Sequence, residues 1–258
     1  MNRTITAAAC AFAAAGLLLG GQAAAAPTLN PSVAPGGNFD LSHWQLQLPI
    51  GSPGSPTAIA PAKLSGAKGF QDTYFYTDKT DGSMTFWDPE NGVHSQNSNF
   101  ARSELREMNP DNSAKYWQLT GTHRLGATVT VAKVPDHVCV GQIHLDPSSG
   151  STKPLAELYY HSNGDIAIAI ENSPTGGQTP HTVANVPLGT KWSYVITETG
   201  AKTITLSING GAAKSFAVPS SFKGYPMYFK AGDYDQSSGS SSTVGATVHF
   251  YALSVAHS

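Results

Sequence analysis

The sequence is poor in cysteine and in charge, and it has no basic excess. Only two of its 258 residues are cysteine, and Cys10 lies in an N-terminal segment that we expect to be removed. Cys139 is then alone, which excludes an intramolecular disulfide. Lys and Arg number 15 against 17 Asp and Glu, whereas proteins that bind nucleic acid normally carry a basic excess. We therefore expect no nucleic-acid partner, and any anionic ligand must meet a local cluster of cations.

Long apolar runs are confined to the N-terminus. Arg3 precedes an Ala/Leu-rich run at residues 7–19, and four alanines follow at residues 23–26. A charged start, an apolar run and a small-residue site are typical of a secretory signal peptide. A retained membrane anchor is the alternative, but the run is short for a bilayer span. We expect residues 1–26 to be a signal peptide and the mature protein to be secreted, extracellular or periplasmic, without contact with a membrane.

Helical periodicity is missing after the N-terminal segment. Residues 27–37 are rich in Pro, Gly and small side chains and predict an extended lead-in. Short runs of alternating apolar and polar residues then follow one another, separated by turn residues, at 44–48, 166–170, 192–196, 204–208 and 244–255. Asn209-Gly210 is a strong tight-turn signal. The pattern predicts one all-β domain over residues 38–258, an antiparallel sandwich, jelly-roll or barrel.

Three of the expected strands carry unusual polar residues. Alternate side chains of a strand share a face, so Arg102, Glu104 and Arg106 lie together. Glu104 can orient the two guanidinium groups, which then offer paired donors to a carboxylate ligand. A salt-bridged solvent face is the ordinary alternative for such charged alternation.

The second segment places Gln142 and His144 on one face of a strand. Histidine is the commonest general base, although a histidine on a strand is more often structural. In the third segment, residues 228–236, one face carries two tyrosines, a lysine and a glutamine, and Gly232 leaves room for a ligand or a neighbouring backbone. The alternative there is an edge strand on which aromatic rings pack against the lysine stem.

Together the three faces supply several cations and neutral polar groups but a single carboxylate, Glu104. Hydrolysis of glycosides usually needs two carboxylates across the scissile bond, so the pattern fits a glycosidase poorly. The histidines are scattered and lack the paired spacing of metal ligands. We expect an anionic, hydroxyl-rich ligand, no metal and no cofactor.

At these residues the sequence resembles the alginate lyases of polysaccharide lyase family 7. The family motifs Arg-x-Glu-Leu-Arg, Gln-[Ile/Val]-His and Tyr-x-Lys-Ala-Gly-x-Tyr-Asn-Gln correspond to residues 102–106, 142–144 and 228–236. Asp235 departs from the last motif, where Asn is usual, but it should alternate away from the polar face. The resemblance covers residue 39 to the C-terminus and implies an antiparallel β-sandwich jelly-roll with a substrate cleft across its concave sheet.

The resemblance also implies which residues act on alginate. Catalytic roles are implied for Arg102, Gln142, His144 and Tyr234, and substrate-binding roles for Glu104, Arg106, Tyr228, Lys230 and Gln236. Arg102 and Gln142 would neutralise the uronate carboxylate. His144 would take the proton at C5 of guluronate and Tyr234 would protonate the leaving oxygen. For mannuronate, Tyr234 could serve as both base and acid, and neighbouring cations would lower its pKa.

Ile143, at the centre of the second motif, accompanies activity on guluronate-containing chains within the resembling family. Endolytic cleavage by a monomer is the expectation, because no blocking domain is evident in the sequence. Two alternatives remain open at this stage: a lyase for another polyuronate such as glucuronan, and a non-catalytic carbohydrate-binding sandwich.

Overall fold

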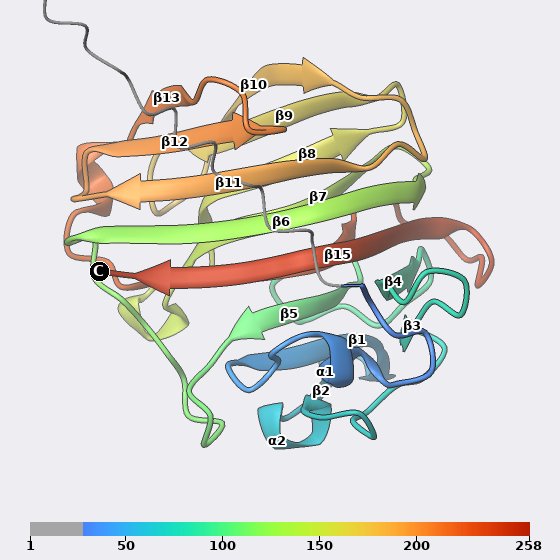
Figure 1. Ribbon diagram of the computed structural model, residues 1–258. Helices are drawn as coiled ribbons and strands as arrows, with labels where there is room; N and C mark the ends of the chain where they lie inside the picture. The colour runs from blue at the N-terminus through green and yellow to red at the C-terminus, as the bar shows by residue number, and fades with distance from the viewer. Residues whose placement is uncertain (1–27) are drawn as a thin grey trace, which may run out of the picture.

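The computed structural model describes residues 28–258, and the predicted signal peptide lies outside this part of the chain. Two antiparallel sheets pack face to face, as Figure 1 shows. The eight-stranded sheet has the spatial order β10 (Gln178–Asn185), β9 (Asp165–Glu171), β8 (Pro154–His161), β7 (His137–Leu145), β14 (Met227–Asp235), β5 (Ser103–Glu107), β1 (Trp44–Ser52) and β2 (Ser55–Ile59). The seven-stranded sheet has the order β13 (Lys214–Ala217), β12 (Thr203–Ile208), β11 (Trp192–Thr199), β6 (Thr122–Lys133), β15 (Gly245–His257), β4 (Met84–Pro89) and β3 (Phe75–Thr77).

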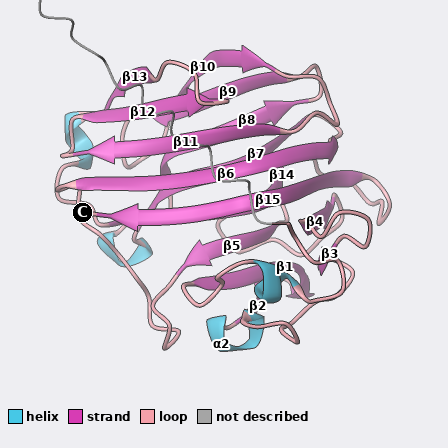
Figure 2. Cartoon of the chain, in the orientation of Figure 1, coloured by secondary structure: helices cyan, strands magenta, loops and turns pink. Residues whose placement is uncertain are grey.

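Helix is confined to single turns, coloured cyan in Figure 2. They are α1 (Pro35–Asn38), α2 (Pro61–Leu64) and the 3-10 turns η1 (Pro147–Ser149) and η2 (Ser220–Phe222). Among residues 28–258, no helix is long and apolar enough to cross a membrane. The predicted all-β jelly-roll is therefore confirmed.

The expected strands are present at the predicted runs, with one correction near the N-terminus. Asn209 and Gly210 both have positive φ, 53° and 67°, which confirms the tight turn after β12. The lead-in, however, is not extended throughout, because α1 forms there. Pro35 is buried at the first helical position, where its fixed φ suits a helix, and the N–H of Phe39 closes the turn on its carbonyl.

Alternation along the strands builds the core between the two sheets. In β7, Ile143 and Leu145 are fully buried in the core, whereas Gln142 and His144 project from the opposite face. The largest fully buried side chains come from both sheets and include Trp192, Tyr194, Phe86, Phe229 and Phe250. The even-numbered polar residues of the three motifs thus lie on the outer face of the eight-stranded sheet, because the alternate positions face the core.

Strand β14 is one of the two central strands of that sheet, beside β7, and contains an irregularity. Its register with β7 shifts between Ala231 and Tyr234. Gly232 has a φ of 153°, and a Cβ there would lie 2.7 Å from the Cα of Glu104. Of the two uses foreseen for this glycine, the structure shows the close approach of a neighbouring backbone. Asp235 is buried on the core side, so this departure from the family motif does point away from the polar face.

Candidate active site

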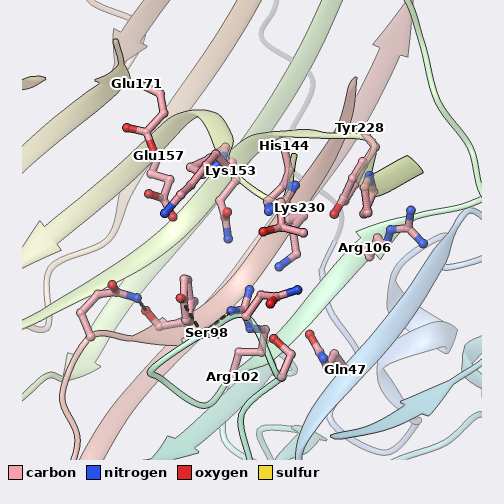
Figure 3. A pocket seen from close by; sticks show the side chains of 18 of the residues that line it. Gln47, Ser98, Arg102, Arg106, His144, Lys153, Glu157, Glu171, Tyr228 and Lys230 are labelled. Carbon is pink, nitrogen blue, oxygen red and sulfur yellow. Dashed lines mark hydrogen bonds between the residues drawn. The ribbon is translucent and has the colours of Figure 1, made fainter. Parts of the chain in front are cut away.

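A cleft of about 740 Å³ crosses the eight-stranded sheet. Its lining extends from Ala58 on β2 to Gln178 on β10 and includes the loop residues Ser95–Ser98. Eight of the nine predicted site residues line it: Arg102, Arg106, Gln142, His144, Tyr228, Lys230, Tyr234 and Gln236. The ninth, Glu104, is fully buried beneath them. Figure 3 shows labelled side chains from β1, β5, β7, β8, β9 and β14 converging on this space.

Glu104 holds three of the cleft residues together. Its Oε2 accepts from the Arg102 guanidinium at 3.3 Å and forms a very short ion pair with Lys230. Its Oε1 accepts from the amide of Gln142. Arg102 directly precedes β5, Lys230 lies on β14 and Gln142 on β7, and the register of these neighbouring strands brings Gln142, Lys230 and Arg106 into one row. One buried carboxylate therefore fixes the positions of three donors that are far apart in the sequence.

Arg106 is held differently from the prediction, which assigned both arginines to Glu104. The guanidinium of Arg106 donates to the hydroxyl of Tyr116 at 2.8 Å and lies 4.3 Å from the ring centre of Tyr228. Lys230, which lies opposite Arg106 in the β14–β5 register, forms the ion pair with Glu104 instead. Arg106 is thus oriented by aromatic rings, and its remaining N–H groups can face a ligand.

Lys230 and His144 have lowered pKa values for related reasons. Burial, with the positive charge of Arg102, lowers the pKa of Lys230 to about 8, although Glu104 opposes the shift. Burial, with the positive charge of Lys230, lowers the pKa of His144 to about 3. The His144 Nδ1 lies 2.9 Å from the carbonyl of Leu145, and since a carbonyl only accepts, Nδ1 carries the proton. The neutral ring therefore has an unprotonated Nε2.

Tyr234 stands against Arg102, whose guanidinium carbon is 3.7 Å from its ring centre. Its hydroxyl is 3.0 Å from Ser98 Oγ. Burial raises the pKa of Tyr234 above its ordinary value, outweighing the opposite effect of Arg102. Arg102 does act to lower this pKa, as expected of a neighbouring cation, but desolvation of the phenolate is the larger effect and sets the net direction. Tyr234 is a protonated phenol at neutral pH.

Tyr228 and Gln236 complete the predicted set. The ring of Tyr228 lies 5.1 Å from that of His144, and burial raises the pKa of Tyr228 to about 12. Gln236 uses its amide nitrogen on the carbonyl of Tyr234, so its amide oxygen is the group left for a ligand. Both residues line the cleft as predicted, Tyr228 near the start of β14 and Gln236 directly after its end.

The β8–β10 end of the cleft is acidic, which sequence reasoning did not foresee. Glu157 is buried, accepts from the hydroxyl of Tyr159 at 2.6 Å and also binds the amide of Gln178. Burial raises the pKa of Glu157 and that of Glu171 on the next strand. Figure 3 shows Glu157 and Glu171 on one side of the cleft, away from Arg102 and Arg106. Only the alternation of β8 and β9 could have indicated them.

Several other cleft residues were not predicted from the sequence. Gln45 and Gln47 alternate with the apolar residues of β1, a pattern that was visible but was not assigned to the site. Ser98 belongs to no strand and to no motif, so no sequence signal marks it. Within residues 28–258, no cluster of His, Cys, Asp and Glu is arranged to hold a metal ion.

The protein is thus of the antiparallel jelly-roll class, with cations gathered in a cleft across one sheet that suit an acidic ligand. A family profile described as alginate lyase matches residues 39–257. The chain is 28% identical to the alginate lyase of Klebsiella pneumoniae, over 87% of this chain and 91% of that protein. It belongs to the alginate lyases of polysaccharide lyase family 7.

Solved structures agree with this assignment. The family 7 alginate lyase A1-II′, crystallised with the substrate GGMG, is 35% identical and superimposes with a TM-score of 0.78. The comparison covers 88% of this chain and 98% of that one. The alginate lyase PA1167 of Pseudomonas aeruginosa is 31% identical with a TM-score of 0.77, over 85% of this chain and all of that one.

Proposed function

We propose that the protein depolymerises alginate by β-elimination at the 4-O-glycosidic bond, leaving an unsaturated uronate end. The observation that carries the proposal is the placement of a neutral imidazole and a neutral phenol, His144 and Tyr234, on either side of the donors held by Glu104. Elimination requires a base, an acid and a means of stabilising negative charge on the uronate carboxylate. The cleft supplies a separate group for each task.

Arg102 and Gln142 stabilise the negative charge that develops on the uronate carboxylate. Loss of the C5 proton gives the adjacent carboxylate enolate-like character, and preplaced donors stabilise that charge because they need no reorganisation during the reaction. Both donors are buried and already oriented by Glu104. Each such donor is typically worth about 10²–10³ in rate. Lys230 and Arg106 add positive charge that attracts the uronate.

His144 is the base in this scheme. Its Nε2 lone pair is free in the neutral tautomer, and the hydrogen bond from Nδ1 to Leu145 fixes the ring. Burial and the positive charge of Lys230 hold the pKa of His144 at about 3. A bound uronate carboxylate offsets that positive charge, so the pKa of His144 rises on binding substrate, when a stronger base is needed.

Tyr234 is the acid, and its raised pKa supports this role over that of a base. A phenol that keeps its proton at neutral pH can donate to the departing glycosidic oxygen. Removing the C5 proton from mannuronate on the same face would need ionised Tyr234, which burial opposes. Guluronate presents its proton and leaving group on opposite faces and suits two separate residues. We therefore propose a preference for guluronate-containing blocks.

Endolytic action follows from the length of the cleft, whose lining runs from β2 to β10 and suits an internal stretch of chain. We also propose that the protein acts as a monomer outside the cytoplasm, after removal of residues 1–26. A polymeric substrate is met there, and no partner is needed to complete the donor set around Glu104.

Ultraviolet absorbance of the unsaturated product tests the proposal. The protein is incubated separately with polyguluronate, polymannuronate, mixed alginate and polyglucuronate. We expect the fastest gain on polyguluronate or mixed alginate, with a rapid fall in viscosity because internal bonds are cut. No gain on any polymer would leave a binding module, and a gain confined to polyglucuronate would make the protein a lyase for another uronan.

A further inference from the structure

Ser98 lies in the segment between β4 and β5, and its hydroxyl connects two proposed catalytic groups. Ser98 Oγ is 2.9 Å from Nη2 of Arg102 and 3.0 Å from the hydroxyl of Tyr234. The same oxygen is 2.9 Å from the carbonyl oxygen of Phe100 and 3.2 Å from the Phe100 N–H. Dashed lines in Figure 3 mark the contacts of Ser98 with its cleft neighbours.

Chemistry limits how the hydrogens of this cluster can be placed. A serine hydroxyl has one hydrogen to donate and two lone pairs with which to accept. Arginine can only donate, so Arg102 donates to Ser98. The Phe100 N–H is the second donor, so both lone pairs of Ser98 are used. The one hydrogen of Ser98 is left for the Phe100 carbonyl or the Tyr234 hydroxyl, and when it is donated to Tyr234 the phenol proton is free to face a substrate.

We propose that Ser98 is a positioning residue for proton transfer by Tyr234. It holds the phenol hydroxyl in one rotational position and ties it to Arg102, so that the proton donor and the carboxylate-binding cation keep a fixed separation. The inference rests on the proposed function, in which Tyr234 protonates the leaving oxygen. Tyr234 also packs edge-on against Phe100, with ring centres 6.4 Å apart, so the short segment 98–100 supports both its ring and its hydroxyl.

Ser98 can also stabilise the phenolate that proton transfer leaves on Tyr234. The C5–H bond breaks and its proton moves to Nε2 of His144. The C4–O bond then breaks with its electron pair, and the Tyr234 proton moves to the departing oxygen, leaving a phenolate. Ser98 can turn its own hydrogen from Phe100 to that phenolate without losing it. A hydrogen bond to the charged form lowers the pKa of Tyr234, which makes the phenol a better acid.

Replacing the serine tests the inference on the full-length mature protein. We expect Ser98→Ala to lower kcat on polyguluronate roughly tenfold, the effect of losing about 1.4 kcal/mol of transition-state stabilisation, with KM changed less than twofold. Ser98→Thr keeps the hydroxyl and should recover most of kcat. Asn99→Ala is the matched control, because Asn99 is exposed in the same segment and is not part of the cleft lining.

A substrate with a better leaving group separates proton donation from general disturbance of the cleft. A guluronate oligomer that carries nitrophenoxide at C4 needs little help from an acid. The Ser98→Ala defect should therefore shrink to less than twofold on this substrate. An equal defect on both substrates, or normal kcat on polyguluronate, would overturn the inference.

Tyr234→Phe measured in parallel distinguishes two kinds of failure. If Tyr234→Phe keeps its turnover, the acid role itself is wrong and the proposed function must be revised. If Tyr234→Phe is inactive on polyguluronate while Ser98→Ala is normal, the acid role stands and only the role of Ser98 is refuted. Thermal unfolding of Ser98→Ala and Ser98→Thr checks that each variant is folded.

Discussion

Glu104 and Glu107 lie three residues apart on β5, and both are fully buried, yet they face opposite sides of the sheet. Glu104 lies under the cleft and binds Arg102, Lys230 and Gln142. Glu107 points into the sandwich, where it has its own set of partners: Lys115 at 3.1 Å, His257 at 2.6 Å, the Trp117 indole at 3.2 Å and the Phe229 N–H at 3.1 Å.

The difference shows how one residue type serves two purposes on one strand. The partners of Glu104 keep donor hydrogens that a ligand can still reach, since they line an open cleft. The partners of Glu107 connect β5 to β14, to the C-terminal end of β15 and to the segment before β6. In the proposed function Glu104 therefore organises the reacting groups, whereas Glu107 joins the two sheets. Substitutions on the cleft face should mainly lower turnover, whereas substitutions on the core face should mainly lower stability.

The largest effect is expected on the cleft side, at Tyr234. Tyr234→Phe removes the proposed acid and should lower kcat about 10³-fold, within the usual range for general acid catalysis, while oligosaccharide binding and thermal stability change little. Steady-state absorbance assays and calorimetric titration measure the two quantities. Tyr251→Phe, on the seven-stranded sheet, is the matched control. Near-normal turnover in Tyr234→Phe would remove this residue from the acid role.

On the core side, Glu107→Gln should lower stability and leave turnover nearly unchanged. The change breaks a buried ion-pair network and should lower the free energy of unfolding by about 3 kcal/mol in urea titrations. Activity per folded molecule should stay near that of the unmodified protein. A large loss of kcat with normal stability would erase the proposed difference between the two glutamates.

The pH dependence of this loss has a defined sign. Although burial acts to raise it, the hydrogen bond from His257 holds the pKa of Glu107 below its ordinary value of 4.5. Glu107 therefore contributes stability that is present above pH 4.5 and is lost as the pH falls through its lowered pKa in the folded state. The stability difference between the unmodified protein and Glu107→Gln should shrink in that acid range.

Glu104→Gln should move a pH limit of binding. Glu104 supports the charge of Lys230, whose pKa is about 8, so uronate binding should weaken and KM should rise as the pH passes about 8. Without the carboxylate, the pKa of Lys230 falls further and the rise in KM should begin at lower pH. Glu107→Gln should leave the limit unchanged. An identical KM profile for all three proteins would show that Glu104 does not support the cation.

The smallest effect concerns the core below the cleft, where Asp233 is fully buried and neither of its carboxyl oxygens has a hydrogen-bond partner. Burial, with nearby Asp88, raises the pKa of Asp233. A raised pKa means that stability is lost as the pH rises from the ordinary value of 3.8 through the folded-state value. Asp233→Asn should therefore stabilise the protein by about 1 kcal/mol in alkaline buffer and by less in acid. A gain that does not grow with pH would contradict this.

Sequence alternation located the site well where polar residues recur on one strand face. Arg102, His144 and Lys230 reach the same cleft because strands β5, β7 and β14 are neighbours and the even positions share a face. The sequence could not predict that Lys230, and not Arg106, pairs with Glu104, because this depends on the register of β14 against β5.

Other features depended on tertiary placement. Ser98 contacts Tyr234 across 136 residues of sequence, and a serine in an irregular loop carries no local signal. The partners of Glu107 could not be predicted either, because His257 lies 150 residues away in the sequence. The net direction of the Tyr234 pKa shift could not be predicted, because the charge of Arg102 was visible in the sequence, whereas the extent of burial was not.

The central claim, that His144 and Tyr234 divide the proton transfers, is tested most directly at His144. The measurement is the absorbance gain on polyguluronate with His144→Asn, in which a side-chain amide can still donate to Leu145. We predict a loss of at least 10²-fold in kcat, while guluronate oligomers still bind. Turnover of His144→Asn at the rate of the unmodified protein would assign the base to another group and contradict the account.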